Sequence, residues 1–223
     1  MKKPIAAQQA RSRESLQRLL KAAAEILQED GLEGATIPRI SARAGLTPGA
    51  VYRRFPDKDA LMQTVVLTIA QENDANLTKL LTPERAAELT LKEAFGEMLQ
   101  MTVKSYRRSS RLLSAVVQYF QSHPDAAFRK KADSMEVRSF NRMVDYLLHF
   151  RKEIRHPEPE RALAFVLTVV SHSLREILIG ETTTDIWAPL LPKNDEQLVK
   201  ELNDMMLAYL QNGGHPKGKS TSA

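Results

Sequence analysis

The spacing of apolar and polar residues along the chain predicts helices almost throughout. From Ser15 onward, apolar residues recur at intervals of three and four, as on one face of a helix with a period of about 3.6 residues. The apolar positions of this face are Leu16, Leu19, Leu20, Ala23, Ile26 and Leu27. Gly31 then predicts the end of the helix, since glycine is common just past a helix C-terminus. Residues 1–11 are expected to form a flexible arm ahead of it.

Two short helices joined by a tight turn are expected next. Thr36 is placed to cap a helix over residues 37–44, where Pro38 is tolerated because no hydrogen bond is lost in the first turn. Gly45 breaks the chain, and Thr47 is placed to cap a second helix. The residues expected to face inward are Ile37, Ile40, Ala44, Val51 and Phe55. A turn of about three residues between two such helices is typical of a helix-turn-helix.

The second of these helices begins with small residues and turns polar groups outward. The positions expected on its outer side are Pro48, Gly49, Tyr52 and Arg53. In a DNA-binding helix-turn-helix the first turn of the second helix enters the major groove, so bulk there would hold the backbone away from the bases. Thr47 and Tyr52 can then meet phosphates, and Arg53 can meet a phosphate or a guanine edge. An ordinary helical hairpin with a capped helix remains the alternative at this point.

The charge of the chain is concentrated near its N-terminus. The 223-residue sequence has a formal net charge of +5. Residues 1–58 hold 11 Lys and Arg against 6 Asp and Glu, whereas residues 59–223 hold 21 against 21. This distribution fits a basic N-terminal module for a polyanion joined to a neutral module with another role, although a solvated surface could carry the same surplus.

The residues around the predicted turn resemble a known family. Asp57 is placed to cap a fourth helix, and Lys58 lies in its first turn, where a cation opposes the helix dipole unless an anion compensates. Residues 31–62 resemble the DNA-binding domain of the TetR (tetracycline-repressor) family of bacterial transcription regulators. The resemblance is carried by Gly34, Thr36, Ile40, Ala42, Ala44, Gly45, Leu46, Thr47, Gly49, Tyr52, Phe55 and Lys58. Pro48, Arg54 and the Pro56-Asp57 pair depart from the usual pattern.

The resemblance implies which side chains contact double-stranded DNA. It places Thr36, Thr47, Tyr52 and Lys58 at phosphates. It places Arg39, Pro48, Gly49, Ala50 and Arg53 nearest the bases. Arg43 could serve either class or only solubility. The family further implies a repressor that binds an inverted-repeat operator as a homodimer.

The rest of the chain predicts a helical bundle. Amphipathic runs between residues 59 and 212 are separated by breaks at Thr82-Pro83, His123-Pro124, His156-Pro157 and Gly180. The helix near 159–179 is apolar almost all round in its first half, and the last helix, near 196–211, carries two apolar stripes. The resemblance implies dimerisation through these two helices, with a monomer whose final helices simply lie deep as the alternative. The expected interface residues are Phe165, Val169, His172, Val199, Met206 and Leu210.

Methionine and aromatic residues are frequent in the middle of the chain. Their adaptable side chains can line a pocket for an apolar or amphipathic ligand, although they are also ordinary core residues. The family layout favours a cavity for a small-molecule effector. The residues expected to line it are Phe95, Met98, Met101, Tyr119, Phe120, Phe128, Phe140, Met143 and His172.

Other classes of protein are disfavoured. The sequence has no cysteine, no HExxH motif and no glycine-rich phosphate loop, so we expect no enzyme, metal site or cofactor. No secretory signal or membrane span is expected, and cytoplasmic localisation is the default. The prediction is an all-α regulator with a three-helix DNA-binding domain (residues 1–57), a ligand-binding and dimerisation domain entered through the fourth helix (58–212), and a disordered tail (213–223). A helical adaptor or architectural protein without ligand control is the alternative.

Overall fold

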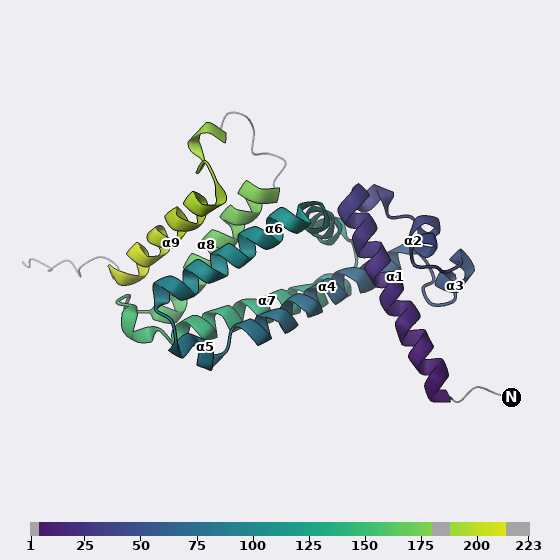
Figure 1. Cartoon of the computed structure of the whole chain (residues 1–223), viewed down its shortest axis with the longest axis horizontal. Helices are drawn as coiled ribbons and strands as arrows, with labels where there is room; N and C mark the ends of the chain where they lie inside the picture. The colour runs from purple at the N-terminus through teal and green to yellow at the C-terminus, as the bar shows by residue number, and fades with distance from the viewer. Residues whose placement is uncertain (1–4, 180–187, 213–223) are drawn as a thin grey trace, which may run out of the picture. The chain divides into compact units, whose positions relative to one another are not determined.

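The computed structural model describes residues 5–179 and 188–212, which form helices and their connections (Figure 1). The α-helices are α1 (Ile5–Gly34), α2 (Ile37–Arg43), α3 (Pro48–Tyr52), α4 (Lys58–Leu80), α5 (Pro83–Ala87), α6 (Leu91–Ser122), α7 (Ala126–Leu148), α8 (Pro159–Ile179) and α9 (Asp195–Gln211). Two short 3-10 helices are η1 (Arg151–Glu153) and η2 (Ala188–Leu190). No strand occurs in the described ranges, and the predicted all-α class is confirmed. The predicted tail at 213–223 lies outside them.

The chain forms two compact units that differ from the expected division. The first unit holds the chain up to Ala75 together with Ser109–Val137, and the second holds Asn76–Arg108 together with the chain from Arg138 onward. The expected boundary between residues 57 and 58 therefore does not separate compact units, because Leu61 and Val65 of α4 are buried in the same core as α1. As a division of function, that boundary remains a prediction.

The core of the first unit follows the predicted helix faces. Leu19, Ala23, Ile26 and Leu27 of α1 are buried, as are the five inward residues expected from α2, α3 and the adjoining turns. Ala115, Tyr119 and Phe128 complete this core from the later parts of the chain, where α6 ends and α7 begins. Helix α1 packs against α2, and α2 packs against α3.

Helix α1 begins earlier than expected. The structure is helical from Ile5, so residues 5–11 are not the expected flexible arm, and residues 1–4 lie outside the described chain. The stretch from Ile5 to Gln28 contains neither glycine nor proline, and its alanines and glutamines favour a helix. Gly31 interrupts the helical geometry with a φ of 68°, as its predicted role as a stop requires, although helical turns continue to Gly34.

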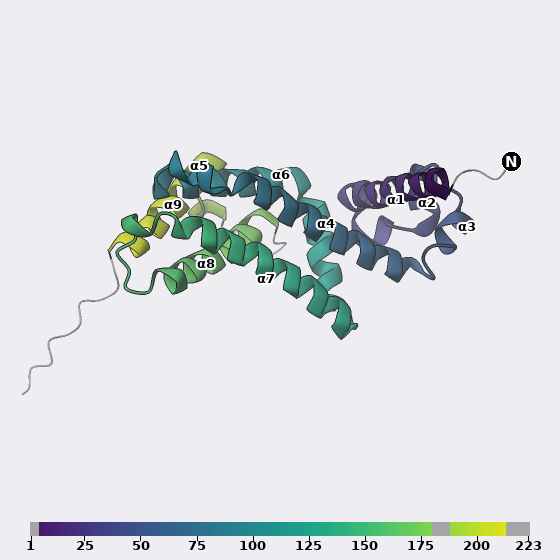
Figure 2. The same cartoon turned by 90° about the horizontal axis from the view of Figure 1, so that it is seen from below.

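The core of the second unit is built from α6, α7, α8 and α9, and α8 and α9 lie side by side in both views (Figures 1 and 2). Within the described chain, α8 is long and apolar enough to cross a membrane, although no such segment was expected from the sequence. Seven of its residues are buried in the protein: Ala162, Leu163, Val166, Leu167, Val170, Leu174 and Leu178. A core helix of this kind passes the same test of length and hydropathy, so the test is weak support for a membrane span.

The two apolar stripes of α9 are arranged opposite to the expectation. Val199, Met206 and Leu210, which we expected at a dimer interface, are buried in the core of the second unit. Met205 and Tyr209 are instead exposed, at 49% and 40% of their surfaces. The sequence shows two stripes but cannot say which one the rest of the unit covers. The predicted interface positions on α8 are exposed: Phe165, Val169 and His172.

The residues expected to line a ligand cavity divide between the two cores. Tyr119, Phe120 and Phe128 pack in the core of the first unit. Four others pack in the core of the second unit: Phe95, Met98, Phe140 and Met143. Met101 and His172 are exposed. The expected set is therefore not one group, because periodicity identifies apolar faces without saying which faces meet.

Candidate nucleic-acid interface

The turn between α2 and α3 is fixed by glycine and by backbone hydrogen bonds. Gly45 has a φ of 67°, in the left-handed region where a side chain is strained. Its N–H donates to the carbonyl of Ala42 at 3.1 Å, and the N–H of Leu46 donates to the carbonyl of Ser41 at 2.8 Å. The turn therefore holds the two helices in a fixed relation, as a helix-turn-helix requires.

Threonines begin both helices but use their hydroxyls differently. The Oγ1 of Thr47 accepts the N–H of Ala50 at 3.2 Å, so this predicted cap is confirmed. Thr36 occupies the cap position of α2, but its side chain makes no capping hydrogen bond. A hydroxyl that accepts one hydrogen bond can still donate its own hydrogen. Both hydroxyls therefore retain a hydrogen to donate to an external oxygen such as that of a phosphate.

The outer side of α3 is open, as the sequence predicted. Val51 and Phe55 are buried, whereas Pro48, Gly49, Tyr52 and Arg53 are exposed. A Cβ added at Gly49 would meet no atom within 4 Å, so packing within the protein does not require glycine there. Over the described residues, the side chain of Arg53 has no hydrogen-bond or ion-pair partner. Small residues and an unpaired guanidinium thus occupy the surface that would face DNA.

The two arginines of α2 are paired with carboxylates of α1. Arg43 makes two hydrogen bonds to Glu29, at 2.7 and 2.9 Å, and the side chain of Arg39 binds Asp30 and the carbonyl of Gly34. The hydrogen bond from Arg43 lowers the pKa of Glu29, and the same bond raises the pKa of Arg43. Exposed pairs of this kind contribute little to stability, because water and salt screen them. They orient the guanidinium groups, a role that sequence reasoning did not identify.

Arg54 lies just past α3, the helix expected to enter the major groove, which we name the recognition helix, but its side chain faces α1. Its Nη2 donates to the hydroxyl of Ser12 at 2.7 Å and to the carbonyl of Ser12 at 3.0 Å. The Oγ of Ser15 lies 3.4 Å from the same nitrogen. These contacts attach the end of α3 to α1. The departure from the family pattern at Arg54 thus has a structural explanation.

Lys58 is the first residue of α4, and its side chain lies near the C-terminal end of α1. Its Nζ donates to the carbonyl of Leu32 at 3.3 Å, and the side chain is half-buried. Asp57 accepts the N–H of Ala60 at 2.8 Å, which confirms the predicted cap. Since an ammonium group has three donors, Lys58 keeps two for an anion.

Comparison with known proteins places this interface in a family. Residues 19–65 match the model for bacterial regulatory proteins of the tetR family. The HTH-type transcriptional regulator BetI of Escherichia coli is 28% identical over 168 residues, which cover 73% of this chain and 82% of BetI.

The chain carries a DNA-binding domain of the TetR family.

Solved structures show that the whole TetR-family fold is shared. A putative TetR-family regulator from Mesorhizobium loti matches with a TM-score of 0.68 at 17% identity, over 90% of this chain and 96% of that one. The regulator FadR of Bacillus subtilis, solved with stearoyl-CoA, matches with a TM-score of 0.59 at 18% identity, over 89% and 99% of the two chains. The family match over residues 19–65 and the likeness to BetI point to a transcriptional regulator and not to an enzyme.

In this TetR-family chain, a polar network holds the first turn of α4. The phenol of Tyr119 donates to Asp59 Oδ1 at 2.5 Å, and Gln63 donates to Oδ2 at 3.0 Å. His123 Nε2 lies 3.1 Å from both carboxylate oxygens. His123 Nδ1 accepts the N–H of Asp125, so Nε2 carries the hydrogen that is donated to Asp59. The network thereby fixes the residue that follows Lys58, and sequence reasoning had assigned Tyr119 to a cavity instead.

The network changes the pKa of two of its members. Partial burial acts to raise the pKa of Asp59, but hydrogen bonds from Tyr119, His123 and Gln63 outweigh it and leave the pKa below its ordinary value of 3.8. Burial and the adjacent Asp59 carboxylate raise the pKa of Tyr119. Both shifts favour the observed pairing of an ionised carboxylate with a neutral phenol.

Replacing Asp59 by asparagine is expected to destabilise the protein by about 1–2 kcal/mol at neutral pH. A hydrogen bond to a charged group contributes about 1.5–3 kcal/mol, and the lower end of this range applies because Asp59 is exposed. The asparagine amide keeps some of these hydrogen bonds, which limits the loss. Because its folded-state pKa is lowered, the contribution of Asp59 is fully present above pH 3.8 and is lost as the pH falls through the folded-state pKa. The difference in unfolding free energy between wild type and Asp59→Asn should therefore shrink in denaturant titrations at progressively more acidic pH. Glu72→Gln, an exposed change on the same helix, is the control. A constant difference at all pH values would contradict this role.

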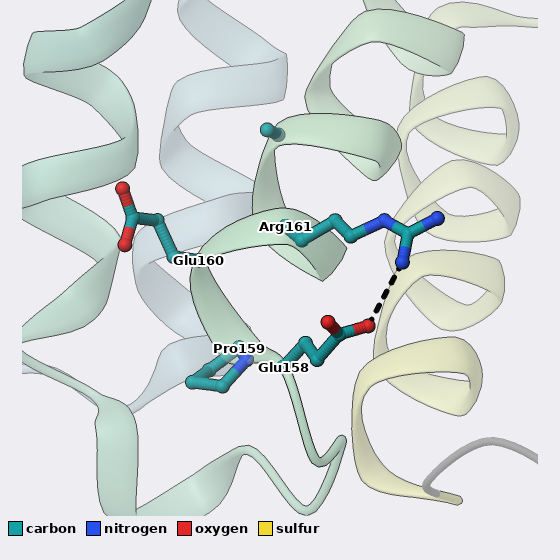
Figure 3. Close-up of a pocket in the computed structure, with 5 residues that line it drawn as sticks. Glu158, Pro159, Glu160 and Arg161 are labelled. Carbon is teal, nitrogen blue, oxygen red and sulfur yellow. Dashed lines mark hydrogen bonds and ion pairs between the residues drawn. The ribbon is translucent and has the colours of Figure 1, made fainter.

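The second unit contains a surface pocket at the start of α8 (Figure 3). It is lined by Glu158, Pro159, Glu160, Arg161 and Ala164. Arg161 Nη1 pairs with Glu158 Oε2 at 3.0 Å, while Glu160 points away from this pair. None of the residues expected to bind a ligand lines this pocket.

Proposed function

We propose that this chain is a homodimeric transcriptional repressor that binds an inverted-repeat operator and is released by a small apolar or amphipathic ligand. The observation that carries DNA binding is the open first turn of α3, with small exposed residues next to the unpaired Arg53. We also assign the DNA contacts at Thr36, Arg39, Arg43, Thr47, Pro48, Gly49, Ala50, Tyr52, Arg53 and Lys58. A regulator of this class acts in the cytoplasm.

The experiment that tests DNA binding is selection of genomic fragments with the purified protein. Two recognition helices related by a two-fold axis require two half-sites in inverted orientation, so the selected fragments should share an inverted repeat. Fragments without a shared sequence, bound equally at all salt concentrations, would favour the helical adaptor alternative.

The exposed faces of α8 and α9 support dimerisation. Phe165 is 55% exposed and Val169 is 37% exposed, although both are large apolar residues. The rings of Phe165 and Tyr209 lie 5.5 Å apart, and those of Tyr209 and His156 lie 5.3 Å apart. With Met205, these residues form an aromatic and apolar face, which we name the α8–α9 face. Exposed apolar patches of this kind commonly mark protein interfaces.

The core of the second unit supports a ligand site. Asn203 of α9 is 7% exposed, and its Nδ2 donates to the carbonyl of Lys92 at 3.0 Å. Its Oδ1 is the one buried side-chain polar atom without a hydrogen-bond partner in the described chain. A buried polar atom without a partner costs about 1–3 kcal/mol, and a donor from an effector would satisfy it. The neighbouring apolar residues, Phe95 and Met98 among them, suit an acyl or other apolar group.

Stearoyl-CoA, the ligand in the structure of FadR, is the first probe to test. If the effector prefers the arrangement that does not bind DNA, saturating operator should weaken its binding by roughly 5–150-fold, because linkage is reciprocal. Asn203→Leu should weaken it by a comparable factor, while Val137→Leu, at an exposed position of α7, should not. Calorimetry with and without operator measures both effects. Binding that operator leaves unchanged would contradict the proposed release.

A further inference from the structure

The N-terminal turns of α1 form a basic helix segment that the DNA-binding core does not cover. The family match begins at residue 19, whereas α1 begins at Ile5, so residues 5–18 precede the matched part of the domain. Residues 9–14 are exposed at every position, and in Figure 1 this end of α1 extends past α2 and α3. A stretch of helix with no buried side chain, such as residues 9–14, gains no stability from packing, so other contacts must hold it against fraying.

A contact that holds this stretch comes from the residues that follow α3. Arg54, two residues past the end of α3, binds the hydroxyl and the carbonyl of Ser12. The segment is thus held to the part of the chain that would enter the major groove. Ser12 lies in the middle of the exposed stretch, so its hydrogen bonds with Arg54 hold a part of α1 that no buried side chain holds.

Arg11 and Arg18 share the side of α1 that faces α2 and the turn. They are seven residues apart, which returns to nearly the same side after two turns at about 3.6 residues per turn. Glu25 continues this row and pairs with Arg43 of α2 at 3.7 Å. The Nη1 of Arg18 would lie 3.9 Å from a Cβ added at Gly45. The row therefore runs along α2 and the turn and then reaches the exposed segment.

Neither arginine is neutralised within the protein. Arg11 and Arg18 are exposed, and neither has a hydrogen-bond or ion-pair partner in the residues that the structure describes. Arg13 is equally exposed but lies about 200° around the helix from Arg11, since each residue advances by about 100°. One side of α1 thus carries two unpaired cations, one beside the turn and one on the exposed segment, and Arg13 does not belong to it.

We propose that Arg11 and Arg18 bind backbone phosphates of duplex DNA beside the half-site that α3 reads, with Arg54 holding the segment in place. The occupant is the flank of the same duplex, because the cationic row is continuous with the DNA-facing turn and a phosphate backbone is the polyanion adjoining it. This inference rests on the proposed DNA binding. It adds contacts that carry no base preference and raise affinity on a duplex long enough to reach them.

The test uses the full-length protein and two selected duplexes, one with long flanks and one trimmed to the half-sites. Arg11→Ala and Arg18→Ala should each make the slope of log affinity against log salt less steep by about 1.8 on the long duplex. This is two phosphates per dimer at about 0.9 each. Neither variant should change affinity for the trimmed duplex. Arg13→Ala is the matched control and should bind both duplexes as the wild type does.

Lys58→Ala separates failure of this inference from failure of the proposed function. If Lys58→Ala weakens binding while Arg11→Ala and Arg18→Ala match Arg13→Ala, the flank contacts are wrong and the recognition site stands. If all four variants bind as the wild type does, the proposed DNA interface itself is wrong. Arg54→Ala should reproduce the flank effect on the long duplex, because the segment loses its attachment to α3.

Discussion

Replacing Arg53 and Lys58 together by alanine is expected to weaken operator binding roughly a thousandfold at about 0.15 M salt. Arg53 has no partner in the described residues, and Lys58 uses only one donor within the protein, so both cations are available to phosphates. Across a dimer the two substitutions remove four contacts. The slope of log affinity against log salt should therefore become less steep by about 3.6, at about 0.9 per phosphate.

Fluorescence anisotropy with labelled operator over a range of salt measures both quantities. The matched control removes two exposed cations outside the interface, Lys79 and Lys130, and should leave the slope unchanged. A double variant that is folded and keeps the wild-type slope would show that the recognition helix is not the DNA-contacting element. The single variants should also differ, because loss of Arg53 can relax base preference whereas loss of Lys58 should weaken all sequences alike.

Replacing Phe165 or Val169 by glutamate is expected to convert the protein from a dimer to a monomer. Both side chains are exposed on the α8–α9 face, so the change places a charge in the proposed interface and leaves the core of each protomer intact. Light scattering should give about twice the 25.1 kDa chain mass for wild type and the single mass for the variants. Affinity for the inverted repeat should fall by about a hundredfold or more, because two linked half-sites commonly gain about 10²–10⁴ over one.

The control for this experiment is Val137→Glu. Val137 is 57% exposed on α7, outside the α8–α9 face, and should tolerate a charge without a change in mass. Circular dichroism and thermal unfolding should show that all three variants keep their helices. If the protein remains a dimer with either substitution on α8, the interface lies elsewhere. If the wild-type protein is a monomer, the proposed binding of a homodimer to an inverted repeat is wrong.

The DNA-binding part could be predicted closely because its signals are local. A glycine with a positive φ, a threonine cap and small residues after it act within a few positions, and Gly45, Thr47 and Gly49 each lie where such rules place them. The ion pairs of Arg39 and Arg43 could not be predicted, because their carboxylate partners are on α1. Arg54 departs from the family pattern for the same reason, since its partner Ser12 lies 42 residues away.

The second half of the chain was harder to predict because its packing depends on distant contacts. Two apolar stripes on α9 are equivalent in the sequence, and only the placement of α6 and α8 decides that Met206 is buried while Met205 is exposed. Tyr119 has an aromatic side chain of the kind that lines cavities, yet its hydroxyl donates a hydrogen bond to Asp59. The sequence pattern does not distinguish aromatic and methionine residues that line a cavity from those that pack in a core, because the difference depends on their neighbours in space.

The first compact unit is discontinuous in the chain, and this limits how the protein can be rebuilt. Residues 109–137 supply Ala115, Tyr119 and Phe128 to the core that also contains the helix-turn-helix. A fragment cut after residue 57 would lose α4 as well. A fragment cut after residue 75 would leave that core incomplete and Asp59 without Tyr119 and His123. Hybrid regulators that join this DNA-binding part to the sensor of a relative must therefore exchange two segments of sequence together. The junctions belong near Ala75, Ser109 and Val137, inside helices, where the helical register has to be preserved across each one.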